Sequence, residues 1–278
     1  MAFNTKTFIT RTASAAVFVA VLLLCVWYNY YSFSLFFALV GFVGLHEFYT
    51  LSKNLHIQAN RPIGFLLHAI TVLIAFFYSF PEVAATVKLL ALFFIVCCSM
   101  LFVFELFSSK PHLSNIAYTI MAWLYVSLPF ALLIVLGLNK NAAFEPQKVL
   151  GMIFFIWIND TGAYLVGSFL GKNKMYEKIS PGKTWEGTIG GVLLCVGLSF
   201  LMVKIFPQLD LKHWMAVSAI VAVFGTVGDL VESMFKRLVG VKDSGSIMPG
   251  HGGVLDRFDS LIFSTPFVFA YLAATGNL

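Results

Sequence analysis

The segment from Thr12 to Leu45 reads TASAAVFVAVLLLCVWYNYYSFSLFFALVGFVGL and contains no charged residue. A helix rises about 1.5 Å per residue, so a single helix of this length would measure roughly 50 Å, whereas one bilayer span needs about 20 apolar residues. We therefore expect the segment to fold back on itself. The turn is best placed between Trp27 and Tyr31, because amphipathic aromatic rings gather at the membrane interface.

The rest of the chain repeats this apolar pattern. Of its 278 residues, 59% are hydrophobic and only 11% are charged, whereas ordinary soluble domains carry about 25% charged residues. We expect an all-α, polytopic membrane protein with about nine transmembrane helices. Beyond the first two, the expected spans cover residues 62–80, 86–108, 114–137, 148–171, 187–206, 212–235 and 258–276.

The basic residues predict the orientation of these spans. With the N-terminus in the cytoplasm, most of them fall on cytoplasmic segments, as the positive-inside rule requires. Those left for the far side are Lys88, Lys140, Lys148, Lys204 and Lys212. Because the basic residues lie in short loops between spans, topology and anionic lipid explain the net charge of +5 better than nucleic acid does.

No linker, repeat or separate soluble domain is visible, so we expect one integral membrane unit. In it, residues 1–150 would form a lipid-facing scaffold, and residues 151–278 would carry the reactive loops on the cytoplasmic side. His46 and Glu47 lack the second histidine of a zinc-binding HExxH helix. We assign both residues, and Glu105, to packing or to the membrane interface. The four cysteines lie within apolar spans, and we interpret them as packing residues.

Asp160 is the first strong functional candidate. It follows the apolar stretch from Met152 to Ile158 and precedes another that ends near Leu170. A carboxylate inside a span is unfavourable by a few kcal/mol unless it is paired, hydrated or bound to metal, so such residues are candidates for function. A structural hydrogen bond is the alternative.

A basic loop follows, with GKNK at residues 171–174 and SPGKTWEG at residues 180–187. Its Gly-Lys-Thr is similar to the end of a phosphate-binding P-loop, but Glu177 stands where that motif needs glycine, and we expect no preceding strand. We therefore reject a P-loop. Free backbone N–H groups and lysines at the start of a helix can still hold phosphates. Ordinary positive-inside topology is the alternative.

Four polar residues share one face of an expected helix, because they recur at i, i+3, i+4 and i+7: Asp229, Glu232, Ser233 and Lys236. Asp256 and Asp259 lie one turn apart at the start of the last span. Clustered carboxylates suit Mg²⁺, which prefers oxygen ligands and bridges phosphates. A structural ion-pair cluster is the alternative. The candidate metal ligands are Asp160, Asp229, Glu232, Asp256 and Asp259.

The C-terminal motifs resemble the signature of the phosphatidate cytidylyltransferase family. They are SMFKR at 233–237, KD at 242–243, HGG at 251–253 and DRFD at 256–259. The resemblance extends upstream through DTGAY at 160–164 and the 180–187 motif, so it covers about residues 155–262. At Gly182 many members carry a second lysine, which leaves Lys183 as the phosphate-binding candidate of this loop.

The resemblance implies that CTP and phosphatidic acid react to give CDP-diacylglycerol and pyrophosphate. It implies that Asp229 and Asp256 hold Mg²⁺ directly, with the other three carboxylates as ligands or neighbours, and that a monovalent cation such as K⁺ lies beside it. The candidate catalytic and phosphate-contacting residues are Asp229, Asp256, Lys183, Lys236, Arg237, Arg257 and His251. We favour a positioning role for His251 over that of a general base. The candidate substrate-binding residues are Ser180, Lys183, Thr184, Glu186, Ser233, Lys242 and Asp243.

Other functions stay open at this point. A CTP-dependent kinase of a polyprenol or similar lipid alcohol would share parts of this pattern, and an ion-coupled transporter would also need charged residues in spans. A scaffold subunit without activity is a third alternative. Gly187 and Gly191 form a GxxxG pair, which allows a homodimer. We expect a bacterial inner membrane, with the active site facing the cytoplasm.

Overall fold

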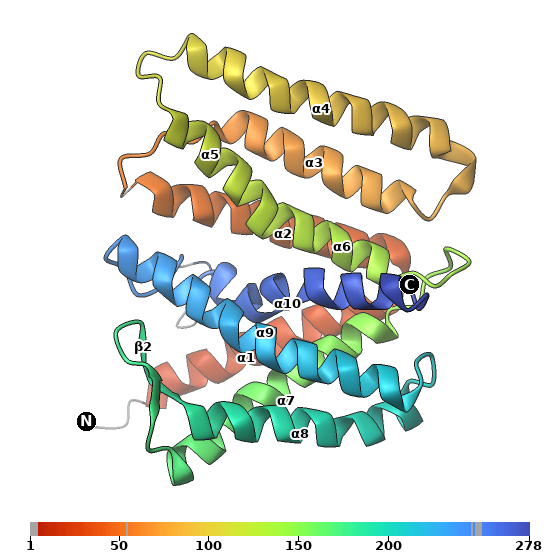
Figure 1. Ribbon diagram of the computed structural model, residues 1–278, viewed down its shortest axis with the longest axis vertical. Coiled ribbons are helices and arrows are strands. Elements are labelled where there is room, and N and C mark those ends of the chain that lie inside the picture. The colour runs from red at the N-terminus through yellow and green to blue at the C-terminus, as the bar shows by residue number, and fades with distance from the viewer. Residues whose placement is uncertain (1–4, 54, 246, 248–251) are drawn as a thin grey trace. The chain divides into compact units, whose positions relative to one another are not determined.

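The computed structural model describes residues 5–53, 55–245, 247 and 252–278 (Figure 1). Its longer helices, in chain order, are α1 (Thr5–Tyr28), α2 (Tyr30–Lys53), α3 (Arg61–Phe77), α4 (Ala84–Leu106), α5 (Leu113–Ala122), α6 (Leu128–Leu136), α7 (Gln147–Leu170), α8 (Trp185–Ile205), α9 (Leu211–Leu238) and α10 (Leu255–Ala274). A short 3-10 turn, Pro81–Val83, precedes α4. Each expected span thus corresponds to a helix or, for residues 114–137, to the stretch from α5 to α6.

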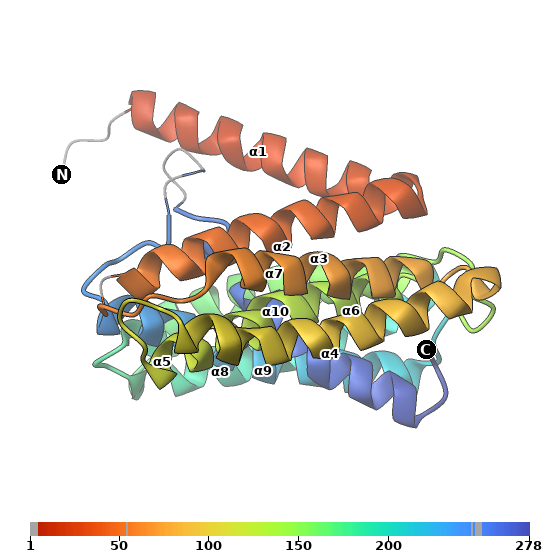
Figure 2. The same ribbon diagram turned by 90° about the horizontal axis from the view of Figure 1, so that it is seen from above.

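The first apolar segment folds back where the sequence predicts it. α1 ends at Tyr28 and α2 begins at Tyr30, and Figure 2 shows the two helices joined at this turn. Asn29 Oδ1 accepts a hydrogen bond from Ser32 N at 2.8 Å, and Ser32 Oγ lies 3.0 Å from Cys25 O. These bonds satisfy polar groups at the turn without help from water.

α5 and α6 form one helical stretch with a local irregularity. A π-turn, Trp123–Ser127, joins them, and Pro129 follows in the first turn of α6. Proline has no N–H to donate, so a helix that contains it changes its hydrogen-bond pattern nearby.

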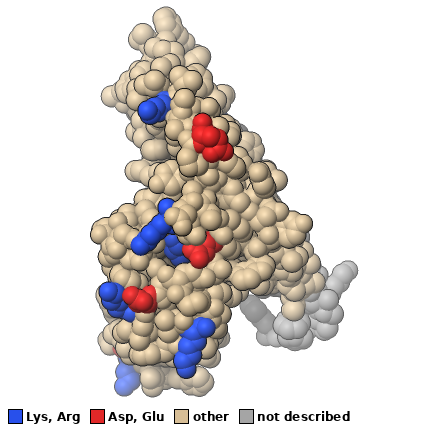
Figure 3. All heavy atoms as spheres, turned by 90° about the vertical axis from the view of Figure 1, so that its right-hand side faces the viewer, with Lys and Arg blue, Asp and Glu red and all other residues tan. Residues whose placement is uncertain are grey.

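Among the described residues, six stretches are long and apolar enough to cross a membrane: Tyr30–Ser52, Pro81–Leu106, Leu113–Leu136, Gln147–Leu170, Trp185–Ile205 and Leu211–Leu238. Thr12–Tyr28 and Arg61–Phe77 are apolar but shorter. Uncharged residues cover most of the face drawn in Figure 3. The chain therefore has the helices of an integral membrane protein, while the count of nine spans and the cytoplasmic N-terminus stay predictions.

The loop between α7 and α8 is more ordered than its sequence indicates. Two short antiparallel strands, β1 (Lys174–Tyr176) and β2 (Ser180–Thr184), pair Lys174 with Thr184 and Tyr176 with Ser180. The expectation that this region holds no strand is therefore wrong. The Gly-Lys-Thr residues lie in β2 itself, and not in a loop that opens a helix, as a P-loop requires.

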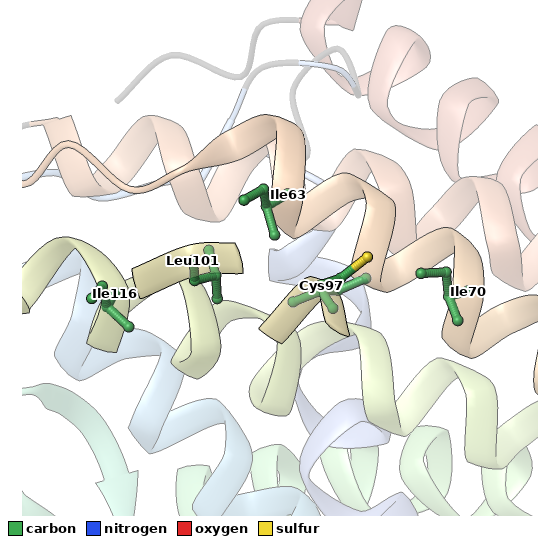
Figure 4. Close-up of a cluster of buried hydrophobic side chains, with 6 residues drawn as sticks. Ile63, Ile70, Cys97, Leu101 and Ile116 are labelled. Carbon is green, nitrogen blue, oxygen red and sulfur yellow. The ribbon is translucent and has the colours of Figure 1, made fainter. Parts of the chain in front are cut away.

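The chain divides into two compact units, residues 1–135 with 239–257, and residues 136–238 with 258–278. We call them the first and second unit and describe each by itself. The first unit holds α1–α6 and the start of α10. Part of its core lies among α3, α4 and α5, where Ile63, Ile70, Cys97, Leu101 and Ile116 meet (Figure 4). Cys97 is a buried free thiol there, which confirms its interpretation as a packing residue.

The second unit holds the β-hairpin and α7–α9, with the remainder of α10. Glycines bring α7 and α8 close together. A Cβ added at Gly187 would lie 2.6 Å from Ala163 O and 3.1 Å from Gly167 Cα, and one at Gly191 would lie 2.6 Å from Asn159 Oδ1. The GxxxG pair thus serves a contact within the chain, and a homodimer stays a prediction.

Candidate active site

A cavity of about 440 Å³ lies in the second unit, between α7, the β-hairpin, α8 and α9. Five residues that the sequence singles out line it: Asp160, Ser180, Lys183, Thr184 and Asp229. They come from three motifs that are up to 69 positions apart in the chain. Lys174 adds a second ammonium group to the wall. The cavity therefore combines carboxylates and lysines, as a site for a metal-bound polyphosphate requires.

Lys183 and Asp229 form the central ion pair of this cavity. Lys183 Nζ lies 2.7 Å from Asp229 Oδ2, and it also donates to Thr226 O at 3.2 Å. The side chains are 23% and 38% exposed, respectively. The pair is open to the cavity, so an incoming anion can compete with Asp229 for the ammonium group.

Two more carboxylates lie within electrostatic range of this pair. Asp160, in α7, lines the cavity and is exposed there. Asp259, on α10, interacts electrostatically with Asp229, Asp160 and Lys183. A Cβ at Gly228 would lie 2.7 Å from Asp259 O, which shows how closely α9 and α10 approach beside Asp229. The cavity thus holds Asp160, Asp229 and Lys183, and Asp259 lies near enough for their charges to affect it.

The expected polar face of α9 divides into two pairs. Ser233 Oγ donates to Asp229 Oδ1 at 3.2 Å, which steadies the carboxylate through the oxygen that does not face Lys183. One turn further along α9, Lys236 forms an ion pair with Glu232, which is only 2% exposed. Direct metal binding by Glu232 and phosphate contact by Lys236 both stay predictions.

Asp256 lies in the first unit, at the first turn of α10. Its Oδ2 accepts hydrogen bonds from Gly253 N at 2.7 Å and from Ser244 N and Ser244 Oγ, each at 2.9 Å. Gly252 has a φ of 82°, and a Cβ there would lie 2.6 Å from Asp256 Oδ2. Glycine avoids both the strained φ and the overlap, so the Gly-Gly pair lets the backbone turn tightly around this carboxylate.

Glu47 also takes part in this arrangement, although its sequence context favours packing. It is 3% exposed, and its carboxylate accepts hydrogen bonds from Val254 N, Leu255 N and Ser244 Oγ. Its partners lie about 200 positions away along the chain. The one sequence signal for it is a carboxylate near the end of an apolar span.

Comparison with known proteins now decides the family. The model of the cytidylyltransferase family matches residues 9–275. The chain belongs to the cytidylyltransferase family. It is 35% identical over 239 residues to the phosphatidate cytidylyltransferase of Staphylococcus saprophyticus, a match that covers 84% of this chain and 87% of that protein.

Other members of the family are more similar over shorter stretches. The identity to the phosphatidate cytidylyltransferase of Staphylococcus epidermidis is 41% over 161 residues, or 57% of this chain and 60% of that protein. The identity to the Staphylococcus aureus protein of the same name is 42% over 154 residues, or 55% of this chain and 57% of that protein. The matched stretch therefore spans less than two thirds of these two relatives.

Several family motif residues hold the local structure in place. Thr184 Oγ1 caps α8 by accepting from Gly187 N at 3.2 Å. Glu186, in the first turn of α8, accepts bonds from Lys172 N at 3.1 Å and from Asn173 Nδ2 at 2.6 Å. It thereby closes the base of the hairpin that carries Lys183. Substrate contact by Thr184 and Glu186 stays a prediction.

The remaining candidates lie in exposed positions or outside the described residues. Lys242, Asp243, Arg237 and Arg257 are exposed. His251 lies outside the described residues.

The family resemblance implies a bound magnesium ion, which requires oxygen donors. Among the residues that the structure describes, no three Asp, Glu, His or Cys side chains are placed together as ligands of one ion. The chemistry of the donors nevertheless fits. Asp160, Asp229 and Asp259 supply oxygen alone, and Mg²⁺ usually takes one or two protein carboxylates and completes its shell with water and phosphate. The donor chemistry of the second unit therefore suits Mg²⁺, and the magnesium site itself stays a prediction.

Proposed function

We propose that this chain transfers the cytidylyl group of CTP to phosphatidic acid, giving CDP-diacylglycerol and pyrophosphate for phospholipid synthesis. The observation that carries this proposal is the cavity in which Asp160, Lys183 and Asp229 meet. Membership of the cytidylyltransferase family and the names of the relatives support it. The enzyme would thus be a nucleotidyltransferase embedded in the bilayer.

The reaction needs alignment more than it needs a covalent intermediate. An oxygen of the lipid phosphate attacks the α-phosphorus of CTP, and pyrophosphate leaves. A phosphate monoester has its second pKa near 6, so it is mostly dianionic at pH 7 and needs no general base. The protein has to bring two anions together and to neutralise the charge on the leaving group.

Lys183 is the residue of this chain best placed to do so. Its ammonium group is held at the cavity wall by Asp229, and a phosphate oxygen can take the place of that carboxylate. Ser233 holds Asp229 from the other side, so Asp229 stays oriented when Lys183 turns to the substrate.

Magnesium, held by Asp229 with Asp160 and Asp259 beside it, would neutralise charge on the polyphosphate. The assignment of Asp256 as a further direct ligand, and of K⁺ as a second ion, rests on the family resemblance. We also propose that the membrane is a bacterial inner membrane, because the relatives are bacterial. The basic loops support a site that faces the cytoplasm.

The test is product analysis with purified, detergent-solubilised protein. CTP and Mg²⁺ are supplied with phosphatidic acid in one reaction and with a polyprenol in another, and EDTA replaces Mg²⁺ in the control. We expect pyrophosphate and CDP-diacylglycerol from phosphatidic acid, and neither of them in EDTA. CDP with a phosphorylated polyprenol would show a lipid kinase instead, and no turnover of any lipid would favour a transporter or a scaffold.

A further inference from the structure

Glu47 holds the beginning of α10 although it belongs to α2. Its Oε1 accepts a hydrogen bond from Val254 N at 2.9 Å, and its Oε2 accepts one from Leu255 N at 2.9 Å. Leu255 is the first residue of α10. The first N–H groups of a helix have no partner within the helix, and they favour a negative charge. A buried carboxylate that accepts two of them fixes both the position and the direction of the helix start.

The same carboxylate is linked to Asp256 through one hydroxyl group. Ser244 Oγ lies 3.0 Å from Glu47 Oε2 and 2.9 Å from Asp256 Oδ2. A serine hydroxyl has one hydrogen to donate, so it can serve only one of these carboxylates at a time. The backbone N–H groups of Ser244 and Gly253 donate to Asp256 Oδ2 as well. The orientation of Asp256 therefore depends on the backbone segment that Glu47 holds.

The backbone on both sides of this segment leaves no room for a side chain next to Glu47. A Cβ at Gly245 would overlap Glu47 Oε1. A Cβ at Gly253 would overlap Ser244 Oγ and would lie 2.5 Å from Glu47 Oε2. The two glycines thus allow the main chain to pass close to the Glu47 carboxylate on both sides.

We infer that Glu47 is a positioning residue for the reaction: it holds the start of α10 and thereby fixes Asp256. The catalytic part of this inference rests on the proposed function. Glu47 acts through Asp256 and through the backbone of residues 244–255, and it has no part in binding CTP. Its loss should therefore lower kcat much more than it changes the KM for CTP.

The first experiment compares Glu47→Gln with Glu105→Gln. The amide keeps the size of the side chain, but its NH₂ group faces a backbone N–H and cannot accept from it. Glu105 is a matched control, because it is a buried carboxylate of the same unit. It accepts hydrogen bonds from His112 N and Asn115 Nδ2, which lie 7 and 10 positions along the chain and not at the start of α10. Amide hydrogen exchange, thermal unfolding, kcat and KM are measured for both variants and for the wild type.

We expect Glu47→Gln to lower kcat by roughly tenfold or more, since small displacements of catalytic groups have effects of that size or larger, and to change the KM for CTP by less than about twofold. The amides of Val254 and Leu255 should exchange faster in this variant. Glu105→Gln should leave kcat and the exchange rates of these two amides unchanged, even if it lowers the unfolding temperature by as much as Glu47→Gln does. Ser244→Ala, which removes only the linking hydroxyl, should lower kcat without a change in KM.

The inference is overturned if the folded Glu47→Gln variant keeps the wild-type kcat. It is also overturned if the two variants have the same unfolding temperature and Glu105→Gln loses as much activity as Glu47→Gln. Unchanged exchange at Val254 and Leu255 in Glu47→Gln would also overturn it. If the wild type makes no CDP-diacylglycerol, the proposed function fails, while the exchange data still decide whether Glu47 holds the start of α10.

Discussion

At the scale of the residue, Lys183 and Asp229 form the charged pair of the candidate site. The two side chains come from β2 and α9, and their ion pair stands at the wall of the cavity with each side chain partly exposed. Ion pairs of that kind add about 0–1 kcal/mol to stability, because water screens them. Their more important property is that they hold a cation and a carboxylate ready for a ligand.

Replacing Lys183 by Gln should impair the reaction more than the fold. We expect the KM for CTP to rise, or kcat to fall, by about tenfold or more, because a charged contact to phosphate is lost. The thermal unfolding midpoint should change by only a few degrees. Lys204→Gln, at the last turn of α8 and away from the cavity, is the matched control with unchanged kinetics. Equal kinetics for the two variants would remove Lys183 from the site.

Replacing Asp229 by Asn tests the carboxylate itself. The amide keeps the shape of the side chain and removes the charge that would hold Mg²⁺ and Lys183, so turnover should fall below detection while the thermal unfolding curve stays close to that of the wild type. Asp210→Asn, at the exposed residue just before α9, serves as the control and should remain active. Full activity in purified Asp229→Asn would show that this carboxylate has no catalytic part.

At the scale of the element, α7 and α8 pack closely against each other, and both contribute residues to the wall of the cavity. The hairpin that carries Lys183 connects the end of α7 to the start of α8. Gly187 faces the backbone of α7 at Ala163 and Gly167. A side chain at Gly187 would meet main-chain atoms, which cannot turn away as a side chain can.

Gly187→Ala should therefore destabilise the protein. Forced overlap in a packed contact costs about 1–3 kcal/mol, which would lower the midpoint of thermal unfolding by several degrees. Gly197→Ala on the same helix is the matched control, because a Cβ there meets nothing within 4 Å. Alanine favours helix over glycine by about 0.5–1 kcal/mol, so this variant should be as stable as the wild type or more so. Equal unfolding midpoints for the two alanine variants would contradict the close packing.

The sequence predicts the helices well, because within a bilayer the backbone has to satisfy its own hydrogen bonds and long apolar runs therefore become helices. It does not predict the β-hairpin, since Lys174–Thr184 is polar and shows no alternation. Among the site residues, the motifs bring out Asp160, Lys183 and Asp229, which the structure gathers in one cavity. They do not bring out Glu47, because its partners lie about 200 positions away and only the folded chain brings them together.

At the scale of the whole molecule, the chain combines apolar helices long enough to cross a membrane with membership of the cytidylyltransferase family. The family match extends from residue 9 to residue 275, so it includes α1–α4 as well as the motif-bearing second half. Glu47 is the clearest sign that the first half contributes to function, since it comes from α2 and holds the start of the motif-bearing α10. Polar residues on an otherwise apolar scaffold are thus worth testing even where no motif contains them.

The most direct test of the central claim follows the phosphorus atoms of CTP. Purified protein is given phosphatidic acid and Mg²⁺ with CTP labelled at either the α- or the γ-phosphorus, and the lipid and aqueous products are separated. We predict that the α label enters the lipid as CDP-diacylglycerol and that the γ label appears in pyrophosphate. A γ label in the lipid, with the α label left in CDP, would show phosphoryl transfer and would contradict the proposed reaction.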